Sequence, residues 1–137
     1  MGINVDGTTI KTEIIAESRF ELEPPRYPSW SPVPCLSWND CFTSKLLANA
    51  DRFMDDSVEA RDLIDLAVLR LQSPIPQEAI NKAEKAYEVI RPLKKAIQYF
   101  QDRTDYRERF FEGLQIDRSW IPRIIDGVDL LAEDFNM

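Results

Sequence analysis

A chain of 137 residues, 44% of them hydrophobic and 30% charged, is long enough for one domain with a substantial core and too apolar to be disordered. Its net charge of −7 argues against general binding to nucleic acids or anionic membranes, because both attract Lys and Arg. The absence of histidine removes the usual activator of serine and cysteine nucleophiles, and two cysteines are too few for a disulfide framework or a structural zinc site.

The sequence carries no recognisable targeting or membrane signal. Its first residues lack the basic and apolar regions of a signal peptide. No apolar run approaches the about 18 residues that a membrane-spanning helix needs. We therefore expect a cytoplasmic protein that has no membrane partner.

Two alternating segments predict a β-hairpin within residues 1–23. Residues 8–15 place Ile10 and Ile14 on one face, and residues 18–23 alternate in the same way. A two-stranded sheet alone is marginally stable, so we expect it to pack on helices or to pair with further strands.

A proline-rich connector follows over residues 24–36. Proline fixes φ and removes a backbone donor, so this segment is expected to be extended. Its prolines are Pro24, Pro25, Pro28, Pro32 and Pro34.

Residues 37–137 predict a bundle of about five helices. Ser37 can cap the first and Ser57 the second. The first two expected helices cover about 38–54 and about 58–72. The third begins at Pro76 and ends or kinks at Pro92, after which its apolar stripe continues to Phe100. The last two run from Thr104 to Gly113 and from Asp117 onward. The expected fold class is α+β, mainly α, in a single domain over residues 1–137.

The first two helices carry an unusual set of charges. Asp65 stands in an apolar run, so its carboxylate must be desolvated or paired, because a lone buried charge is costly. Arg61 and Asp62 precede it at helical spacing, and Lys45 and Arg52, seven residues apart, share a face of the preceding helix. A helical hairpin would bring Lys45, Arg52, Asp62 and Asp65 together. On spacing alone, the favoured interpretation is an ion network that joins the two helices, and a catalytic site is the less favoured one.

The same residues resemble a known family. The spacing Lys45, Arg52, Arg61-Asp62-x-x-Asp65-Leu is similar to the C-terminal signature of the AbiEii/AbiGii-type nucleotidyltransferase toxins. The resemblance is good over residues 8–72, and beyond them only the helical character matches. It implies the C-terminal half of a fold like that of DNA polymerase beta.

In that family a Gly-Ser turn and a pair of strand carboxylates hold the nucleoside triphosphate and magnesium, and a later strand supplies a third acid. When the family's motif is mapped onto this sequence, Lys45 matches the lysine that touches the triphosphate. Asp65 matches the helix aspartate that helps organise the site. Glu13 is the candidate third acid, and Arg61 and Asp62 fall on their motif positions. These catalytic candidates are vestigial if the rest of the site is missing.

The chain departs from the family pattern at the metal-binding end. It has no Gly-Ser turn followed by paired strand carboxylates. Phosphoryl transfer with two metals needs several convergent carboxylates, so Glu13 alone cannot hold the metals. We therefore expect a truncated member of the family, inactive alone and without a cofactor. Magnesium with a nucleoside triphosphate enters only if another chain supplies the missing half.

Two further interpretations stay open. The chain could be a non-enzymatic helical module that binds a partner protein, or a working transferase completed by a second chain. The expected partners are a second copy of the chain, paired through the N-terminal hairpin, and an antitoxin or other protein.

Overall fold

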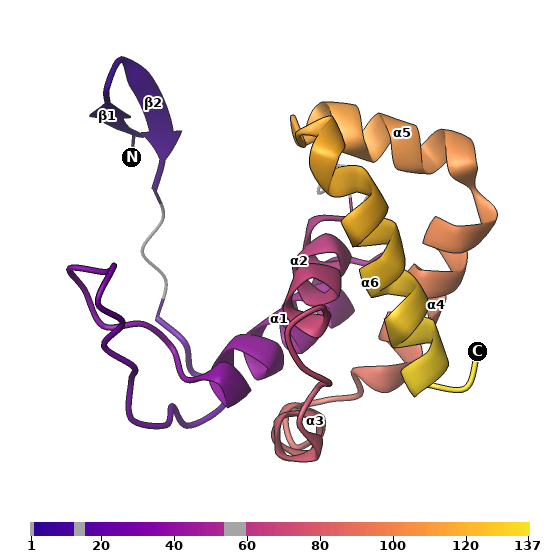
Figure 1. Cartoon of the computed structure of the whole chain (residues 1–137). Helices are drawn as coiled ribbons and strands as arrows, with labels where there is room; N and C mark the ends of the chain where they lie inside the picture. Colours follow the sequence, from indigo (N-terminus) through magenta and orange to yellow (C-terminus); the bar gives the residue numbers. More distant parts are fainter. Residues whose placement is uncertain (1, 13–15, 54–59) are drawn as a thin grey trace.

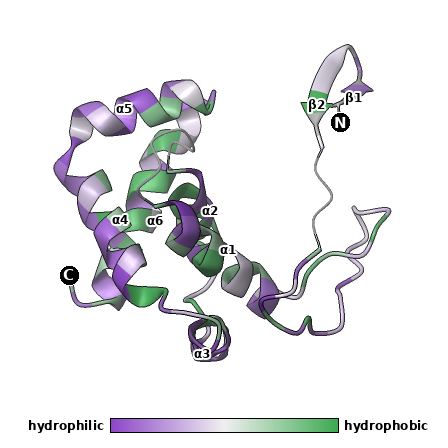
Figure 2. Ribbon diagram, turned by 180° about the vertical axis from the view of Figure 1, so that it is seen from behind, coloured by the Kyte–Doolittle hydropathy of each residue, from purple (hydrophilic) through white to green (hydrophobic). Residues whose placement is uncertain are grey.

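The computed structural model describes residues 2–12, 16–53 and 60–137. Its architecture is a two-stranded hairpin followed by helices, which confirms the predicted α+β, mainly α class. The hairpin consists of β1 (Gly2–Val5) and β2 (Thr8–Lys11), which pair antiparallel with Ile3 opposite Ile10. Figures 1 and 2 show it standing apart from the helices. Ile3 and Ile10 consequently stay 47% and 48% exposed.

The position of the hairpin is set by its turn. Asp6 and Gly7 have φ values of 49° and 81°. These are the left-handed conformations that a two-residue type I′ turn requires, and Asp-Gly is a favoured pair for it. The prediction of a second strand at residues 18–23 is therefore wrong: that segment forms no strand, and β2 pairs with the residues before it. Ile14, expected on the face of Ile10, lies outside the described residues.

The proline-rich connector closes on itself as a loop. Arg26 N donates to Cys35 O at 2.8 Å, and Cys35 N donates to Arg26 O at 2.9 Å. We call residues 26–35 the proline-rich loop. Together with the hairpin and the segment from residue 16, it forms an N-terminal arm beside the helical body (Figure 1).

Six α-helices occur in the described residues, close to the five expected. They are α1 (Trp38–Arg52), α2 (Arg61–Arg70), α3 (Gln77–Glu84), α4 (Ile90–Asp102), α5 (Thr104–Gly113) and α6 (Ile121–Asp134). Ser37 caps α1, with Asp40 N donating to Ser37 Oγ at 3.1 Å. Ser57, the expected second cap, lies outside the described residues. Each of these helices is too short or too polar to cross a bilayer.

Two helix boundaries differ from the prediction. The third helix does not run on to Pro92, because α3 ends at Glu84 and Pro92 lies in the first turn of α4, where a proline needs no donor. Glu84 Oε1 instead accepts hydrogen bonds from the N–H groups of Val89 and Ile90, which start α4. Asp117 caps a short 3₁₀ turn that leads into α6.

The core lies where α1, α2, α4 and α6 meet, and Figure 2 shows hydrophobic residues gathered there. Its largest fully buried side chains include Phe42, Leu63, Ile97 and Leu131. Helix α6 crosses α2 very closely at Gly127, where an added Cβ would lie 2.3 Å from the carbonyl oxygen of Ala67. This packing fixes α2, and with it the charged face that α2 turns toward α1.

Candidate functional site

Four charged side chains meet where α1 packs against α2, and we call them the α1–α2 cluster: Lys45, Arg52, Asp62 and Asp65. Lys45 Nζ lies 2.7 Å from Asp65 Oδ2 and 3.8 Å from Asp62 Oδ1. Arg52 donates to both oxygens of Asp62, from Nε at 3.0 Å and from Nη2 at 2.7 Å. The predicted approach of these four residues is confirmed, whereas their catalytic roles stay a prediction.

Burial distinguishes the two carboxylates of the cluster, whereas the two cations are similarly exposed. The Asp62 side chain is 3% exposed, whereas Asp65 is 42% exposed. The prediction that Asp65, inside an apolar run, is the desolvated carboxylate is therefore wrong, because Asp62 is the buried one. The cause is the position of α1: Asp62 lies on the buried face of α2 together with Leu63 and Leu66, and Asp65 lies at its edge. The Arg52–Asp62 pair therefore joins the helices, and the Lys45–Asp65 pair remains accessible.

An open hollow of about 400 Å³ lies beside the accessible pair. We call it the α1–α2 hollow; it is lined by Leu36, Cys41, Ser44, Lys45, Asp65, Val68 and Leu69. Burial raises the pKa of the Cys41 thiol, an effect that nearby Arg26 partly offsets. Apart from Lys45 and Asp65, the walls offer apolar atoms, one hydroxyl and a neutral thiol. The hollow can therefore accept an apolar group beside one ammonium and one carboxylate.

The remaining predicted site residues are not brought into this cluster. Arg61 is exposed at the start of α2, and it forms no ion pair with the described residues. Glu13 lies outside the described residues, so its role as a third acid stays a prediction.

A second charged group, missed by sequence analysis, attaches the arm to the helices. Asp40 in the first turn of α1 is fully buried, and it accepts from Lys82 Nζ of α3 at 2.7 Å. It also accepts from Glu23 N of the arm at 2.6 Å. Lys82 lies 42 residues from Asp40, and no local pattern connects them.

A third group lies at the other end of α1. Arg19 of the arm donates to Asp51 Oδ2 at 2.7 Å and to the Tyr87 hydroxyl at 2.9 Å, and that hydroxyl donates to Asp51. Burial raises the pKa of Tyr87, and its hydrogen bond to Asp51 acts in the same direction. The hydrogen bond from Arg19 lowers the pKa of Glu17 below its ordinary value, so this carboxylate stays ionised further into the acidic range.

The α1–α2 cluster does not fit a magnesium ion. Asp62 is buried and accepts two hydrogen bonds from Arg52, which leaves Asp65 as the single accessible carboxylate of the cluster, whereas magnesium chemistry needs several. Across residues 2–12, 16–53 and 60–137, no three His, Cys, Asp or Glu side chains gather as a metal site would require. Magnesium in a transferase reaction therefore needs carboxylates in addition to that of Asp65.

Comparison with known proteins gives one match. A family model described as "Nucleotidyl transferase AbiEii toxin, Type IV TA system" matches residues 2–124. The match extends well beyond residues 8–72 and takes in the later helices as far as the first turn of α6. Searches for similar curated proteins and for similar solved structures gave no match.

Proposed function

Because this chain belongs to the AbiEii family of nucleotidyl transferase toxins, we propose that its α1–α2 cluster is the nucleotide-facing part of a nucleotidyltransferase site. The observation that carries the proposal is the Lys45–Asp65 pair, 2.7 Å apart at the rim of an open hollow. In this proposal Lys45 contacts the triphosphate. Asp65 positions Lys45, and the ion pair between Arg52 and the buried Asp62 holds α1 against α2.

The chemistry of the pair suits this role. An ammonium group is a compact charge on a flexible stem and a common ligand of phosphate. Lys45 is 35% exposed and Asp65 is 42% exposed, so an incoming phosphate can take the place of the carboxylate without a buried charge being left unpaired. Catalysis of phosphoryl transfer rests mainly on such positioning and charge stabilisation.

We also propose that residues 1–137 do not transfer nucleotides alone. The sequence lacks the paired strand carboxylates of the family, and the cluster adds only one accessible carboxylate, that of Asp65. The purified chain should therefore give no labelled product with radiolabelled nucleoside triphosphates, magnesium or manganese, and total RNA. Label that is reproducibly transferred, and is lost on Lys45→Ala, would show that the chain is a complete enzyme.

Nucleotide binding tests the role of Lys45 directly. If Lys45 contacts the triphosphate, Lys45→Ala should weaken binding of a fluorescent nucleoside triphosphate by roughly tenfold or more, because a charged contact is worth about 1.5–3 kcal/mol. Arg61→Ala is the matched control. It also removes an exposed cation from the α1–α2 helix pair, but Arg61 lies outside the cluster. Equal affinity in wild type and Lys45→Ala, or equal loss in both variants, contradicts the proposal.

AbiEii toxins belong to toxin–antitoxin systems, which implies an antitoxin partner for this chain. A non-enzymatic, protein-binding role is the second candidate function. The observation that favours it is the exposure of aromatic side chains on the proline-rich loop, where Tyr27 and Trp30 are each 76% exposed. Exposed tryptophan and tyrosine are frequent anchors of protein interfaces.

We further propose that two copies associate through the N-terminal hairpin. Ile3 and Ile10 form one exposed apolar face, and β1 carries no charge and no proline that would protect its edge. Ile3→Lys should weaken self-association by roughly tenfold, because it places like charges on the shared face. Thr9→Lys adds the same charge on the opposite face of the hairpin. Sedimentation equilibrium that shows no difference between the two variants contradicts a role for the Ile3 face.

A further inference from the structure

The α1–α2 hollow opens directly beside the ion pair between Lys45 and Asp65, and both side chains form part of its wall. Its volume of about 400 Å³ lies within the roughly 300–1,000 Å³ of pockets that bind small organic ligands. Apart from this pair and Ser44, its lining is apolar or, at Cys41, a neutral thiol. A group that enters the hollow therefore exchanges water for apolar walls and meets one carboxylate.

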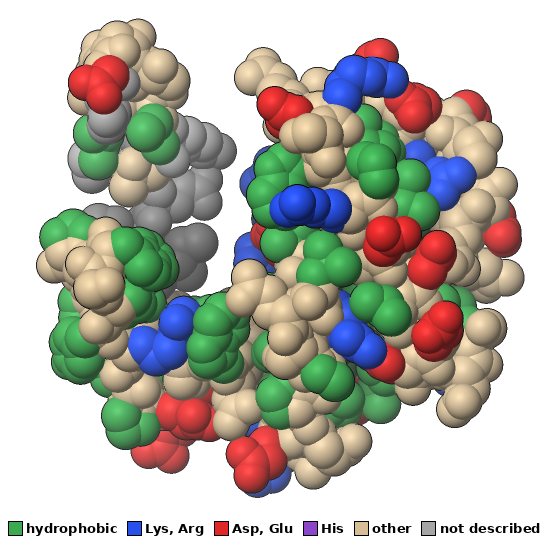
Figure 3. Space-filling model, viewed as in Figure 1, with side chains coloured by type: hydrophobic (Ala, Val, Ile, Leu, Met, Phe, Trp, Pro, Cys, Tyr) green, Lys and Arg blue, Asp and Glu red, His purple; other side chains and the backbone are tan. Residues whose placement is uncertain are grey.

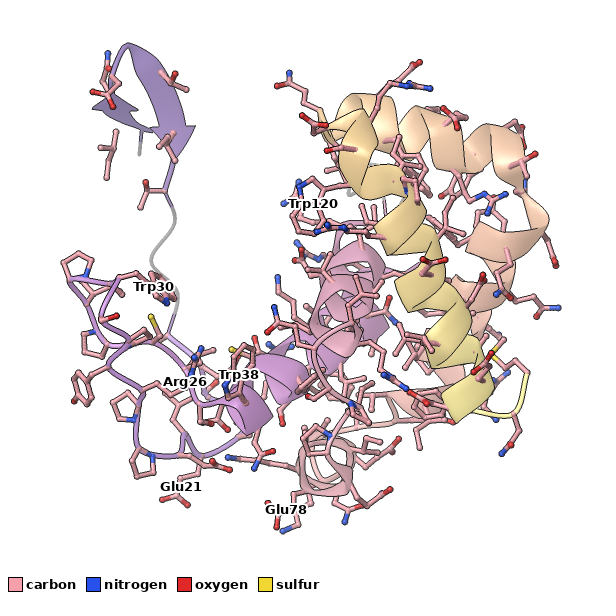
Figure 4. The ribbon with its side chains drawn as sticks, viewed as in Figure 1. Glu21, Arg26, Trp30, Trp38, Glu78 and Trp120 are labelled. Carbon is pink, nitrogen blue, oxygen red and sulfur yellow. The ribbon has the colours of Figure 1, made fainter. Side chains whose placement is uncertain are left out.

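The wall of the hollow is held in place by contacts outside it. A deep gap separates the arm from the helical body in the space-filling view (Figure 3), and the hollow lies where the two join, with Leu36 from the base of the arm and Val68 from α2. The Arg26 guanidinium donates to Leu36 O at 2.7 Å and stacks on Trp38, 4.3 Å from the ring centre. Figure 4 shows Arg26 and Trp38 together at the base of the arm. A wall fixed in advance loses little conformational entropy when a ligand binds.

Binding of a triphosphate at Lys45 changes the surroundings of Asp65. Lys45 Nζ, at 2.7 Å, is the only ion-pair partner of Asp65 among the described residues. When this ammonium turns to a phosphate, the carboxylate is left to water, because Asp65 is 42% exposed. A group that then enters the hollow displaces part of that water. It binds well only if it donates a hydrogen bond to the carboxylate, since an acceptor that loses water without a new donor weakens binding.

A nucleobase meets both requirements of the hollow. Its flat faces suit apolar walls, and in adenine, guanine and cytosine an exocyclic amino group at the ring edge donates N–H. An ionised carboxylate has only acceptor atoms, so it favours such a donor. The base is also joined to the phosphates through the sugar. A triphosphate at Lys45 therefore brings its own base to the neighbouring hollow, whereas an alkyl group would satisfy the walls but not Asp65.

We propose that the α1–α2 hollow receives the base of the nucleotide whose triphosphate contacts Lys45, and that Asp65 accepts a hydrogen bond from the exocyclic amino group of that base. The site rests on the proposed function, because the triphosphate delivers the base. Asp65 then has two successive partners: Lys45 in the free protein, and the base once Lys45 has turned to the phosphate. Asp65 is thereby the residue that selects bases with an exocyclic amino group.

Competition against a fluorescent nucleoside triphosphate tests this selection with nucleotide pairs that differ in one amino group. Adenosine triphosphate is compared with purine riboside triphosphate, and guanosine triphosphate with inosine triphosphate. In at least one pair the nucleotide with the additional amino group should bind wild type roughly tenfold more tightly, the effect of about 1.4 kcal/mol. Asp65→Ala should abolish that difference, because it removes the acceptor. It should not weaken binding of inorganic triphosphate, because Lys45 is retained.

Filling the hollow tests the position of the base. Val68→Tyr adds a large, uncharged side chain to the wall and should weaken nucleotide binding by roughly tenfold, with the affinity for inorganic triphosphate unchanged. Leu71→Tyr is the matched control, because Leu71 is 37% exposed and does not line the hollow. Circular dichroism checks that each variant folds, and Asp65→Ala tests the proposal independently of Val68→Tyr.

The outcomes separate the base site from the triphosphate contact. If Lys45→Ala weakens binding of inorganic triphosphate but both nucleotide pairs show equal affinities, the base site is overturned and the triphosphate contact stands. A difference that survives Asp65→Ala overturns the base site as well, as does a loss of equal size in Val68→Tyr and Leu71→Tyr. Inorganic triphosphate that binds wild type and Lys45→Ala equally overturns both.

Discussion

Replacing Lys82 with methionine is expected to lower the free energy of unfolding by about 3–5 kcal/mol. Asp40 is fully buried, and its only cationic partner in the described residues is Lys82 Nζ at 2.7 Å. Methionine fills a similar volume but leaves the carboxylate with the backbone N–H of Glu23 as its main remaining donor. An uncompensated buried charge is among the most destabilising single changes.

Two controls separate this effect from general damage. Lys85→Met removes an exposed lysine one turn away and should change stability by less than about 0.5 kcal/mol. Asp40→Asn should cost less than Lys82→Met, because the amide oxygen still accepts from Glu23 and Lys82, 22% exposed, can turn to solvent. Chemical denaturation gives all three values. If Lys82→Met costs no more than Lys85→Met, Asp40 is not held as a buried ion.

The helices were predictable because their signals are local. The apolar stripe through Leu93, Ile97 and Phe100 and the boundaries of α5 at Thr104 and Gly113 each depend on residues a few positions apart. The α1–α2 cluster was predictable for the same reason, since helical spacing puts its members on facing sides of two consecutive helices.

Other features depend on information that local patterns do not carry. The prediction of the hairpin rested on alternation at residues 8–15 and 18–23, whereas the Asp6-Gly7 turn decides which strands pair. The Asp40–Lys82 pair joins residues 42 positions apart, so only the packing of α3 on α1 reveals it. Which aspartate of α2 is buried depends on how α1 crosses it, and helical spacing does not determine that crossing.

The difference between Asp62 and Asp65 separates a structural role from an accessible one. Asp62 is 3% exposed and receives two hydrogen bonds from Arg52, whereas Asp65 is 42% exposed with Lys45 as its partner. The first pair therefore has a buried carboxylate and a half-exposed guanidinium, and the second is a surface salt bridge. A buried carboxylate depends more strongly on its partner than an exposed one does.

The same substitution at both positions measures this difference. Asp62→Ala is expected to cost about 2–4 kcal/mol, because two charge-assisted hydrogen bonds between α1 and α2 are lost, although Arg52 regains some water. Asp65→Ala should cost less than about 1 kcal/mol, not the roughly 3–5 kcal/mol that a buried Asp65 would imply.

Double-mutant cycles identify the interaction behind each value. The coupling between Arg52→Ala and Asp62→Ala should exceed about 1 kcal/mol, and that between Lys45→Ala and Asp65→Ala should stay below it. Chemical denaturation of the single and double variants supplies both couplings. Equal costs at Asp62 and Asp65, or a stronger Lys45–Asp65 coupling, would mean that the accessible pair joins the helices. Lys45 would then not be free to leave Asp65 for a phosphate, and the proposed nucleotide contact would lose its physical basis.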